Sequence, residues 1–524
     1  MKKPRLIYYN DAHHFHAKRI DPPLTLHKLH WPVDEVVGTG VEALVLGLGY
    51  GEVYFHNSKI GRVVGEKKEV WENFIDWRIM RMVEDATKMG TDQVREVIKR
   101  GRKMGMPVFP SLKLNDAAQP GQERCGWLKW KHGADVCLRE PDERLVSTEW
   151  CHDFTDERVT ADKLAMIREM LEDYEADGIE LDFMFRPRYF RKAEVEQNIP
   201  VMNQFVAQIR GMANEIGEKR GHEIPIMARV FHSRAENLAV GLDVEAWLKE
   251  KSVDFVVGQV GAQLFETNVV GTGWMADAAN AAGAAAYLRP PRIVYDERTI
   301  FPHIEMFRAL GQTLHWQGFA GMYLGYLPWP FSQTEYQILR EVAYPEVVER
   351  HDKRYILEPR EADATFTPPP DRQLPIQLEQ GETASINILV ADDLESAKGD
   401  GEMREPVLTI RFSNFCIEDE IEIRFNGQIL PWADAEITDE RAMRILARFR
   451  QPLEAPEGFG AHWFRYKLDV ELLKQGENTL EVETRQLTKT AGFARCVNGV
   501  EIQTRFKDFV RPEGLNVERI APSG

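Results

Sequence analysis

The sequence predicts a (β/α)8 TIM barrel followed by a C-terminal antiparallel β-sandwich. Eight short apolar segments alternate with helical stretches over residues 1–345, which is the strand count of a complete barrel with loop insertions. Polar residues directly follow several of these segments, as they do where barrel strands reach the rim. Beyond residue 375 the chain changes to short alternating runs separated by turns such as Asn426-Gly427, the pattern of a sandwich.

The first three strands of the barrel are expected at residues 6–11, 41–48 and 107–114. The second is continuously apolar, as expected of a parallel strand that is buried on both faces. Before the third strand, Val94 and Val97 recur at helical spacing after the capping residue Thr91.

The other strands are expected at residues 179–184, 224–230, 253–259, 285–290 and 318–327, and helices are expected at 162–175, 194–220, 242–250, 275–282 and 302–316. An open doubly wound sheet would need a glycine-rich phosphate turn after an early strand, and the sequence has none. A closed barrel is therefore the expected architecture.

The chain divides by composition into a barrel at 1–345, a linker at 346–375 and a β-sandwich at 376–524. A length of 524 residues is too long for one hydrophobic core. The linker contains Pro368-Pro369-Pro370, which cannot continue a helix or a central strand. We expect the sandwich to brace the barrel, and carbohydrate binding by it remains open.

The formal charge of −17 argues against nucleic acid or an anionic membrane surface as a partner, because the field would repel phosphate. No apolar run reaches the roughly 18 residues that a membrane span needs. The apolar run Leu6–Tyr9 is too short for a signal peptide, and five cysteines without a disulfide framework fit a reducing compartment. The expectation is a cytoplasmic protein, unless a leader has been removed, and a homo-oligomer stays open.

No cofactor and no metal are expected. His13, His14 and His16 follow the first strand, but the carboxylate spacing of a familiar metal motif does not accompany them. Substrate hydrogen bonding or loop packing is the expected role of these histidines. The cysteines between Cys125 and Cys151 include no CxxC pair, so ordinary buried thiols are expected there.

The stretch Asp177-Gly178-Ile179-Glu180-Leu181-Asp182 carries the chemistry that the sequence suggests. Side chains alternate along a strand, so Glu180 and Asp182 share one face and Ile179 and Leu181 share the other. In a barrel the face that carries Glu180 and Asp182 is the interior. Asp182 is the last polar residue on that face, so it lies at the C-terminal rim, where barrel enzymes keep their reacting groups. The alternative is a buried network of these carboxylates with arginines, without chemistry.

Residues 115–154 form a segment far longer than an ordinary strand-to-helix loop, which favours a functional role. The segment holds Trp127, Trp130 and Trp150. Their flat faces suit stacking on sugar rings at a barrel mouth, and simple packing is the alternative.

The segment from Asp177 to Asp182 resembles the fourth-strand signature of glycoside-hydrolase-like (β/α)8 proteins. Chitinase-type barrels carry Asp-Gly-x-Asp-x-Asp-x-Glu, but Met184 stands here where their acid would be, so the chitinase mechanism does not carry over. The chain is more similar to glycosyl-hydrolase-like or family-10-like barrel proteins, which carry DGIELDF before a basic, proline-containing segment, here Arg186-Pro187-Arg188. It also resembles α-galactosidase-type barrels, in which a nucleophilic aspartate ends strand four and the acid/base follows strand six. The tail resembles galactose-binding-type sandwiches.

The resemblance implies hydrolysis of a glycosidic bond by two carboxyl groups. Asp182 is the expected nucleophile or stabiliser, kept ionised by nearby Arg186. Glu266, after strand six, is the expected acid, with Glu297 and Asp116 as alternatives. The residues expected to bind the sugar are Asn10, Asp11, His13, Asn115, Glu180, Arg186, Arg229, His232, Gln259 and Trp329.

The expected partner is a carbohydrate, an oligo- or polysaccharide. Arg186, Arg188 and Arg229 offer paired N–H donors to a sulfate or carboxylate, which suggests an acidic or sulfated substrate. Two other functions stay open: a polysaccharide lyase acting on a uronate-containing glycan, and a non-catalytic carbohydrate-binding barrel.

Overall fold

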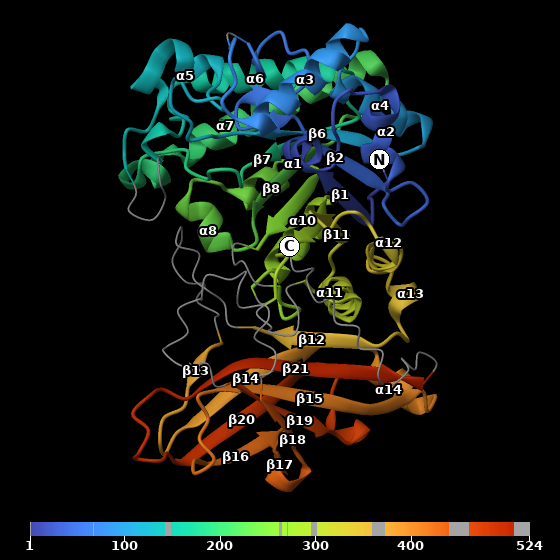
Figure 1. The fold of residues 1–524 in the computed structure, drawn as a ribbon, viewed down its shortest axis with the longest axis vertical. Coiled ribbons are helices and arrows are strands. Elements are labelled where there is room, and N and C mark those ends of the chain that lie inside the picture. Colours follow the sequence, from blue (N-terminus) through green and yellow to red (C-terminus); the bar gives the residue numbers. More distant parts are fainter. Residues whose placement is uncertain are drawn as a thin grey trace.

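The computed structural model describes residues 2–66, 68–141, 148–260, 265–269, 271–294, 301–358, 373–439 and 461–507. Figure 1 shows two parts, a barrel formed by the N-terminal two thirds of the chain and β-sheets formed by the C-terminal third. Among the described residues, no helix combines the length and the apolar character that crossing a bilayer requires.

Parallel strands close into a barrel of eight, in which each strand pairs with its neighbour in chain order and the last pairs with the first. Every strand overlaps one of the eight expected segments, so the predicted barrel is confirmed. The strands are β1 (Leu6–Asn10), β2 (Ala43–Gly47), β6 (Val108–Lys113), β7 (Ile179–Asp182), β8 (Ile226–Phe231), β9 (Phe255–Gln259), β10 (Ala285–Arg289) and β11 (Gly321–Gly325).

Helices follow the barrel strands and cover their outer faces. They are α1 (Ala12–Lys18), α2 (Leu26–Asp34), α3 (Phe74–Lys88), α4 (Gln93–Lys103), α5 (Trp127–His132), α6 (Glu157–Glu172), α7 (Val195–Arg220), α8 (Arg234–Ala239), α9 (Val244–Lys249), α10 (Gly273–Ala282), α11 (Ile304–Trp316), α12 (Gln333–Glu341) and α13 (Pro345–Val348). A small sheet of β3 (Gly49–Tyr50), β4 (Val53–Tyr54) and β5 (Arg62–Val63) lies in the loop after β2.

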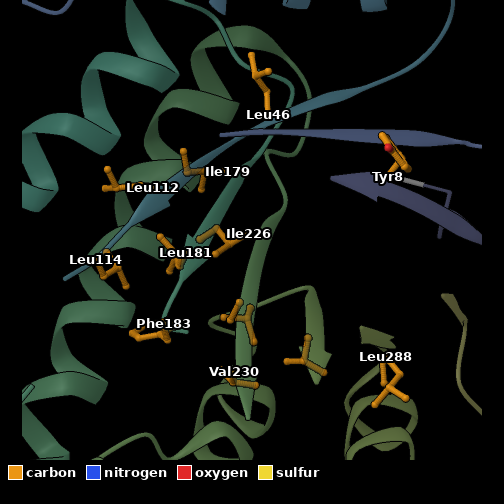
Figure 2. Packing of buried hydrophobic residues seen from close by; sticks show 14 of the residues in the cluster. Tyr8, Leu46, Leu112, Leu114, Ile179, Leu181, Phe183, Ile226, Val230 and Leu288 are labelled. Carbon is orange, nitrogen blue, oxygen red and sulfur yellow. The ribbon is translucent and has the colours of Figure 1, made fainter. Parts of the chain in front are cut away.

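Strand alternation separates two apolar cores in the barrel. Ile179, Leu181 and Phe183 belong to the large outer core between the strands and the helices, part of which Figure 2 shows. A second core, which includes Tyr9 and Tyr323, fills the barrel interior. Because the period along a strand is two, this separation leaves Glu180 and Asp182 on the inner face, as the sequence predicts.

Two antiparallel sheets form the C-terminal part, and the predicted sandwich is confirmed. One contains β12 (Lys353–Leu357), β13 (Ile376–Gln377), β15 (Met403–Ser413), β18 (Glu436–Asp439), β19 (Ala461–Lys467) and β21 (Cys496–Phe506). The other contains β14 (Thr383–Val390), β16 (Glu420–Phe425), β17 (Gln428–Leu430) and β20 (Gly476–Gln486), and α14 (Leu394–Gly399) follows β14.

Strand β12 lies within residues 346–375, where the sequence suggests a linker. It pairs antiparallel with β21, from Lys353 opposite Thr504 to Leu357 opposite Val500, so the sheet of the sandwich begins before the proline run. The side chain of Ala309 from α11 is buried in the apolar core of the sandwich. The barrel therefore packs directly against the sandwich, where α11 lies beside β12 (Figure 1).

Candidate active site

A cavity of about 690 Å³ opens at the carboxyl ends of the barrel strands, and we call it the central cavity. It lies where barrel enzymes keep their reacting groups. Its lining comes from seven barrel strands or the residues just after them, together with the loops that contain β3 and α5 and the first turn of α3. The lining residues are Tyr9, Asp11, His13, His14, Tyr50, Asp76, Lys113, Gln122, Glu123, Arg124, Asp182, Met184, Phe185, Arg229, Gln259, Arg289 and Tyr326.

Asp182 ends β7 and lines the central cavity with a fixed carboxylate. Its Oδ1 accepts hydrogen bonds from the backbone N–H groups of Met184 (2.9 Å) and Phe185 (3.2 Å). Its Oδ2 lies 2.5 Å from Nη2 of Arg229. A carboxylate surrounded only by donors is suited to the ionised, acceptor-only form. Arg229, from the neighbouring strand β8, takes the place expected for Arg186.

Arg186 does not reach Asp182 because the strand ends in a turn. Its φ of +53° breaks the alternation that would continue β7, and it is not among the residues that line the central cavity. The residue directly opposite Asp182 in the parallel pairing is Arg229. Parallel register therefore decides which arginine neutralises this carboxylate.

Glu180 lies below Asp182 in the barrel interior and is fully buried. It accepts a hydrogen bond from Ser111 Oγ (2.6 Å) and lies 3.4 Å from Nε of Arg229. Burial raises the pKa of Glu180, although the Arg229 charge opposes the shift. Arg229 also donates to Oε1 of Gln259 (3.1 Å). The ion-pair network that the sequence leaves open is therefore present, and Asp182 is its end at the cavity.

Asp11 forms a second carboxylate of the central cavity, at the end of β1. It caps α1 by accepting from the backbone N–H of His13 (2.9 Å), and its Oδ2 accepts from the hydroxyl of Tyr326 (2.6 Å). Burial opposes its ionisation, but Lys113 Nζ at 3.8 Å and hydrogen bonds from His14 and Tyr326 outweigh burial. The pKa of Asp11 is therefore held below its usual range, and Asp11 is an anion at neutral pH.

Asp11, His13 and His14 could hold a cation, because one ligand atom from each lies within 4.8 Å of the other two. Burial lowers the pKa of His13 to about 4, so its imidazole is neutral. The Lys113 ammonium, however, already neutralises Asp11. His16 hydrogen-bonds the carbonyl of Ala12 instead of joining the group (2.9 Å). The five cysteines are free thiols.

The cations of the central cavity differ in how they are neutralised. Lys113 pairs with Asp11, and Arg229 pairs with Asp182. Arg124 lies 3.2 Å from Oδ2 of Asp116. Arg289 donates to Gln259 Oε1 and lies over the ring of Tyr326, 5.3 Å from its centroid. Arg289 lines the cavity, and among the described residues no carboxylate lies within ion-pair distance of its guanidinium.

The structure brings only part of the expected site together. Asp11, His13, Asp182, Arg229 and Gln259 line the central cavity, and Glu180 lies beneath it. The other described residues expected at the site are absent from the lining: Asn10, Asn115, Arg186, His232, Glu266 and Trp329.

Three of the displaced residues have structural contacts elsewhere. Asn115 accepts from the backbone N–H of His152 (2.8 Å) and so holds the long segment 115–154. His232 Nδ1 lies 3.3 Å from the carbonyl of Gln259. The Arg19 guanidinium lies over the ring of Trp329, 5.5 Å from its centroid.

Glu266, the expected acid, lies in a segment that turns toward the sandwich. The next residue, Thr267, donates its backbone N–H to the carbonyl of Ile356 in β12 (3.2 Å). Glu266 itself is only 7% exposed. The structure therefore does not place Glu266 in the cavity with Asp182. Of the alternatives, Asp116 is bound by Arg124, and Glu297 lies outside the described residues.

The tryptophans of the long segment pack instead of lining the central cavity. Trp127 and Trp130 lie edge to face, with centroids 6.1 Å apart, and the Arg62 guanidinium lies over both rings. Trp150 packs against the outer core of the barrel. The aromatic rings at the cavity are those of Tyr9, Tyr50, Phe185 and Tyr326.

Sequence reasoning missed several cavity residues, and some carry a readable signal. Lys113 and Arg289 are the last residues of β6 and β10 and share the inward face of their strands, as Asp182 does in β7. Because every second residue of a strand points to the same face, the strand pattern alone predicts that Lys113 and Arg289 point into the barrel. Asp76 lies at the start of a helix and Glu123 lies in a loop. Strand periodicity therefore does not predict that either residue lines the cavity.

No protein-family model and no curated protein sequence matches this chain. Solved structures match at low identity. A cycloisomaltooligosaccharide glucanotransferase from Paenibacillus sp. aligns with 95% of this chain at 10% identity and a TM-score of 0.37. An α-galactosidase from Thermus thermophilus aligns with 69% at 15% identity and a TM-score of 0.39. A maltogenic α-amylase from Thermotoga neapolitana aligns with 91% at 11% identity and a TM-score of 0.37.

This chain spans 57% of the length of the glucanotransferase, 64% of the α-galactosidase and 98% of the amylase. The names of all three describe enzymes that act on glycosides. At 10–15% identity, these likenesses assign neither a substrate nor a catalytic residue to this chain.

Proposed function

We propose that the protein is a glycoside hydrolase that acts in the central cavity, with Asp182 as the carboxylate that stabilises or traps the oxocarbenium-like centre. One observation carries the proposal: Asp182 is held at the carboxyl end of β7 in a cavity that other carboxyl groups also line. The volume of about 690 Å³ falls within the range of small-molecule sites, roughly 300–1,000 Å³.

The chemistry needs two carboxyl groups with different protonation states. Asp182 supplies the anion, because Arg229 and two backbone N–H groups hold its oxygens and leave it little freedom to turn. A second carboxyl must deliver a proton to the leaving oxygen. The other carboxyl groups of the cavity are Asp11, Asp76 and Glu123.

We further propose that the substrate is an acidic or sulfated saccharide. Arg289 supports it, because this guanidinium faces the cavity with no carboxylate partner among the described residues. Arginine presents paired N–H donors that match the oxygens of a carboxylate or sulfate. The arginines first expected in this role are not equivalent, since Asp182 and Glu180 neutralise Arg229.

The reaction is tested by incubating the full chain with a panel of neutral, uronate-containing and sulfated oligosaccharides and analysing the products. We expect new reducing ends from at least one class. In Asp182→Asn the expected result is a loss of turnover by about 10³-fold or more, with substrate binding retained. Asp156→Asn, at the cap of α6 and outside the cavity lining, is the control. Unchanged turnover in Asp182→Asn contradicts the assignment.

The substrate class is tested by comparing Arg289→Met with Arg292→Met. Arg292 also lies over the ring of Tyr326 (5.1 Å) but does not line the central cavity. Loss of Arg289 is expected to lower kcat/KM for an anionic oligosaccharide by about 10- to 100-fold, since a charge-assisted hydrogen bond contributes roughly 1.5–3 kcal/mol. The neutral analogue should be unaffected. Equal losses on both substrates contradict anion recognition by Arg289.

The two other functions give different products in the same assay. A lyase releases unsaturated sugars that absorb in the ultraviolet, and a binding protein releases nothing. A tyrosinate base for the lyase is disfavoured at Tyr326, because burial raises its pKa and its hydroxyl donates to Asp11. Hydrolysis is therefore the reaction that the charged groups of the cavity support best.

A further inference from the structure

We propose that Asp76, in the first turn of α3, is the proton donor to the glycosidic oxygen. This inference rests on the proposed hydrolysis. It assigns the second carboxyl group to a residue that strand periodicity does not reveal and that replaces Glu266 in the role the sequence suggests.

The position of Asp76 is the first argument. Asn73 caps α3, and its Oδ1 accepts from the backbone N–H groups of Ile75 and Asp76. That turn brings Asp76, half-buried, to the central cavity, which Asp182 lines from β7. The two carboxyl groups thus come from different elements and share one cavity.

The contacts of the other carboxyl groups are the second argument. Asp182 pairs with Arg229, and Asp11 pairs with Lys113 and accepts from Tyr326. Glu123 lies 2.5 Å from the ammonium of Lys68. Each of these carboxyl groups has a cation as its partner, and a neighbouring cation favours the charged form. A bound anion is a poor proton donor.

Asp76 differs from them in having no such partner in the part of the chain that the structure describes. Among the described residues, no cation lies within ion-pair distance of its carboxyl group, and no donor hydrogen-bonds its side chain. A carboxyl group without a fixed partner can hold a proton and turn toward a bound leaving group. Asp76 is thus the lining carboxyl group best suited to donate.

The electrostatic surroundings, taken together, favour the protonated form of Asp76. Partial burial, and then the neighbouring carboxylate of Glu123, raise the pKa of Asp76 above its usual value. Lys68 opposes this shift, but its ammonium is already paired with Glu123. The N-terminus of α3 also favours the charged carboxylate and so opposes the rise in pKa. Tyr50, the nearby phenol, stays neutral because burial raises its pKa.

The proposed step balances as follows. The bond between the anomeric carbon and the leaving oxygen breaks, and its electron pair goes to that oxygen, which takes the proton of Asp76 and leaves as an alcohol. Asp182 balances the positive charge at the anomeric carbon. Water then adds its oxygen to that carbon, and the proton it loses restores Asp76.

Leaving-group dependence tests the proposal. Asp76→Ala and the wild-type chain are compared on two glycosides of one sugar, taken from the class that the wild type hydrolyses. One has a sugar alcohol as leaving group, and the other has dinitrophenolate, which leaves without protonation. We expect kcat/KM to fall about 10²- to 10⁴-fold on the first substrate and much less on the second. Glu72→Gln, an exposed neighbour outside the cavity lining, is the control.

A second variant keeps the test independent of folding defects. In Glu123→Gln the charge that raises the pKa of Asp76 is gone, so the alkaline limb of the pH profile of kcat/KM should move to lower pH. Equal losses on both glycosides in Asp76→Ala, or full activity on both, overturn the assignment of Asp76 while hydrolysis stands. A wild-type chain inactive on every glycoside overturns the proposed hydrolysis itself, and Asp76 with it.

Discussion

At the scale of single residues, the central cavity is a set of matched charges. Asp11 is matched by Lys113 and Asp182 by Arg229. The second pair follows from the register of the neighbouring strands β7 and β8, in which Asp182 lies opposite Arg229. Arg289 and Asp76 are the lining groups without an oppositely charged partner among the described residues. The groups without such a partner are therefore the ones expected to bind an anion or donate a proton, whereas Asp182 acts as a carboxylate that Arg229 holds in place.

Asp11 gives a pH-dependent prediction. Its folded-state pKa is lower than its unfolded value of about 3.9, so it contributes stability above that pH and loses the contribution as pH falls toward the folded value. Asp11→Asn keeps the cap of α1 but loses the charge. We expect it to lower the free energy of unfolding by about 1–3 kcal/mol at pH 7 and by less at pH 3.

The measurement is urea denaturation of both proteins at the two pH values. Asp21→Asn serves as the control, because the carboxylate of Asp21 is largely exposed. An equal loss of stability at pH 7 and pH 3 would show that the charge of Asp11 is not what stabilises the fold.

At the scale of elements, a buried charge cluster fixes the long segment 115–154 to the barrel. Glu52, in the turn between β3 and β4, lies 3.0 Å from Lys129 of α5 and 3.2 Å from Lys163 of α6. His152 is its third partner. All four side chains are buried. One carboxylate thus joins three segments that are far apart in the sequence.

Glu52→Gln is expected to be strongly destabilising. It would leave the buried ammonium of Lys129 without its carboxylate and Lys163 with only Asp162, 3.4 Å away. Breaking a buried ion pair in this way costs about 3–5 kcal/mol. The control is Asp173→Asn, which removes the partner of the exposed Lys59 and should change stability by less than about 1 kcal/mol. Chemical denaturation followed by tryptophan fluorescence measures both. A small effect of Glu52→Gln would mean that water reaches the cluster.

At the scale of the whole molecule, the segment after β9 joins the barrel to the sandwich. Thr267 Oγ1 accepts from the backbone N–H of Ile356 in β12 (2.6 Å), and Asn268 Oδ1 accepts from that of Leu389 in β14 (2.8 Å). Ala309 of α11 is buried in the core of the sandwich. This is the segment that contains Glu266, which explains why that residue is absent from the cavity.

Thr267→Val tests this joint. Valine matches threonine in shape but leaves the buried N–H of Ile356 without its acceptor, so we expect a loss of about 1–3 kcal/mol. Thr383→Val, at an exposed position of β14, is the control. Calorimetry of the wild type should show the barrel and the sandwich unfolding in one transition. Two separate transitions in the wild type would contradict the claim that these contacts couple the unfolding of the barrel to that of the sandwich.

The sequence by itself determined the architecture and the direction of its strand residues. Apolar runs and alternation are local properties, and they place eight strands and turn Glu180 and Asp182 inward before any packing is known. The change to short alternating runs likewise predicts the sandwich, although β12 is hidden in an apparently linking segment.

Only the tertiary structure decided which charged groups meet. Arg229 instead of Arg186 reaches Asp182 because parallel register sets that contact, and Glu266 is drawn to the sandwich by bonds to strands about 90 to 120 residues away. Asp76 reaches the cavity from a helix start. Such loop and helix-end positions depend on long-range packing, which no local pattern encodes, whereas a strand residue inherits its direction from its neighbours.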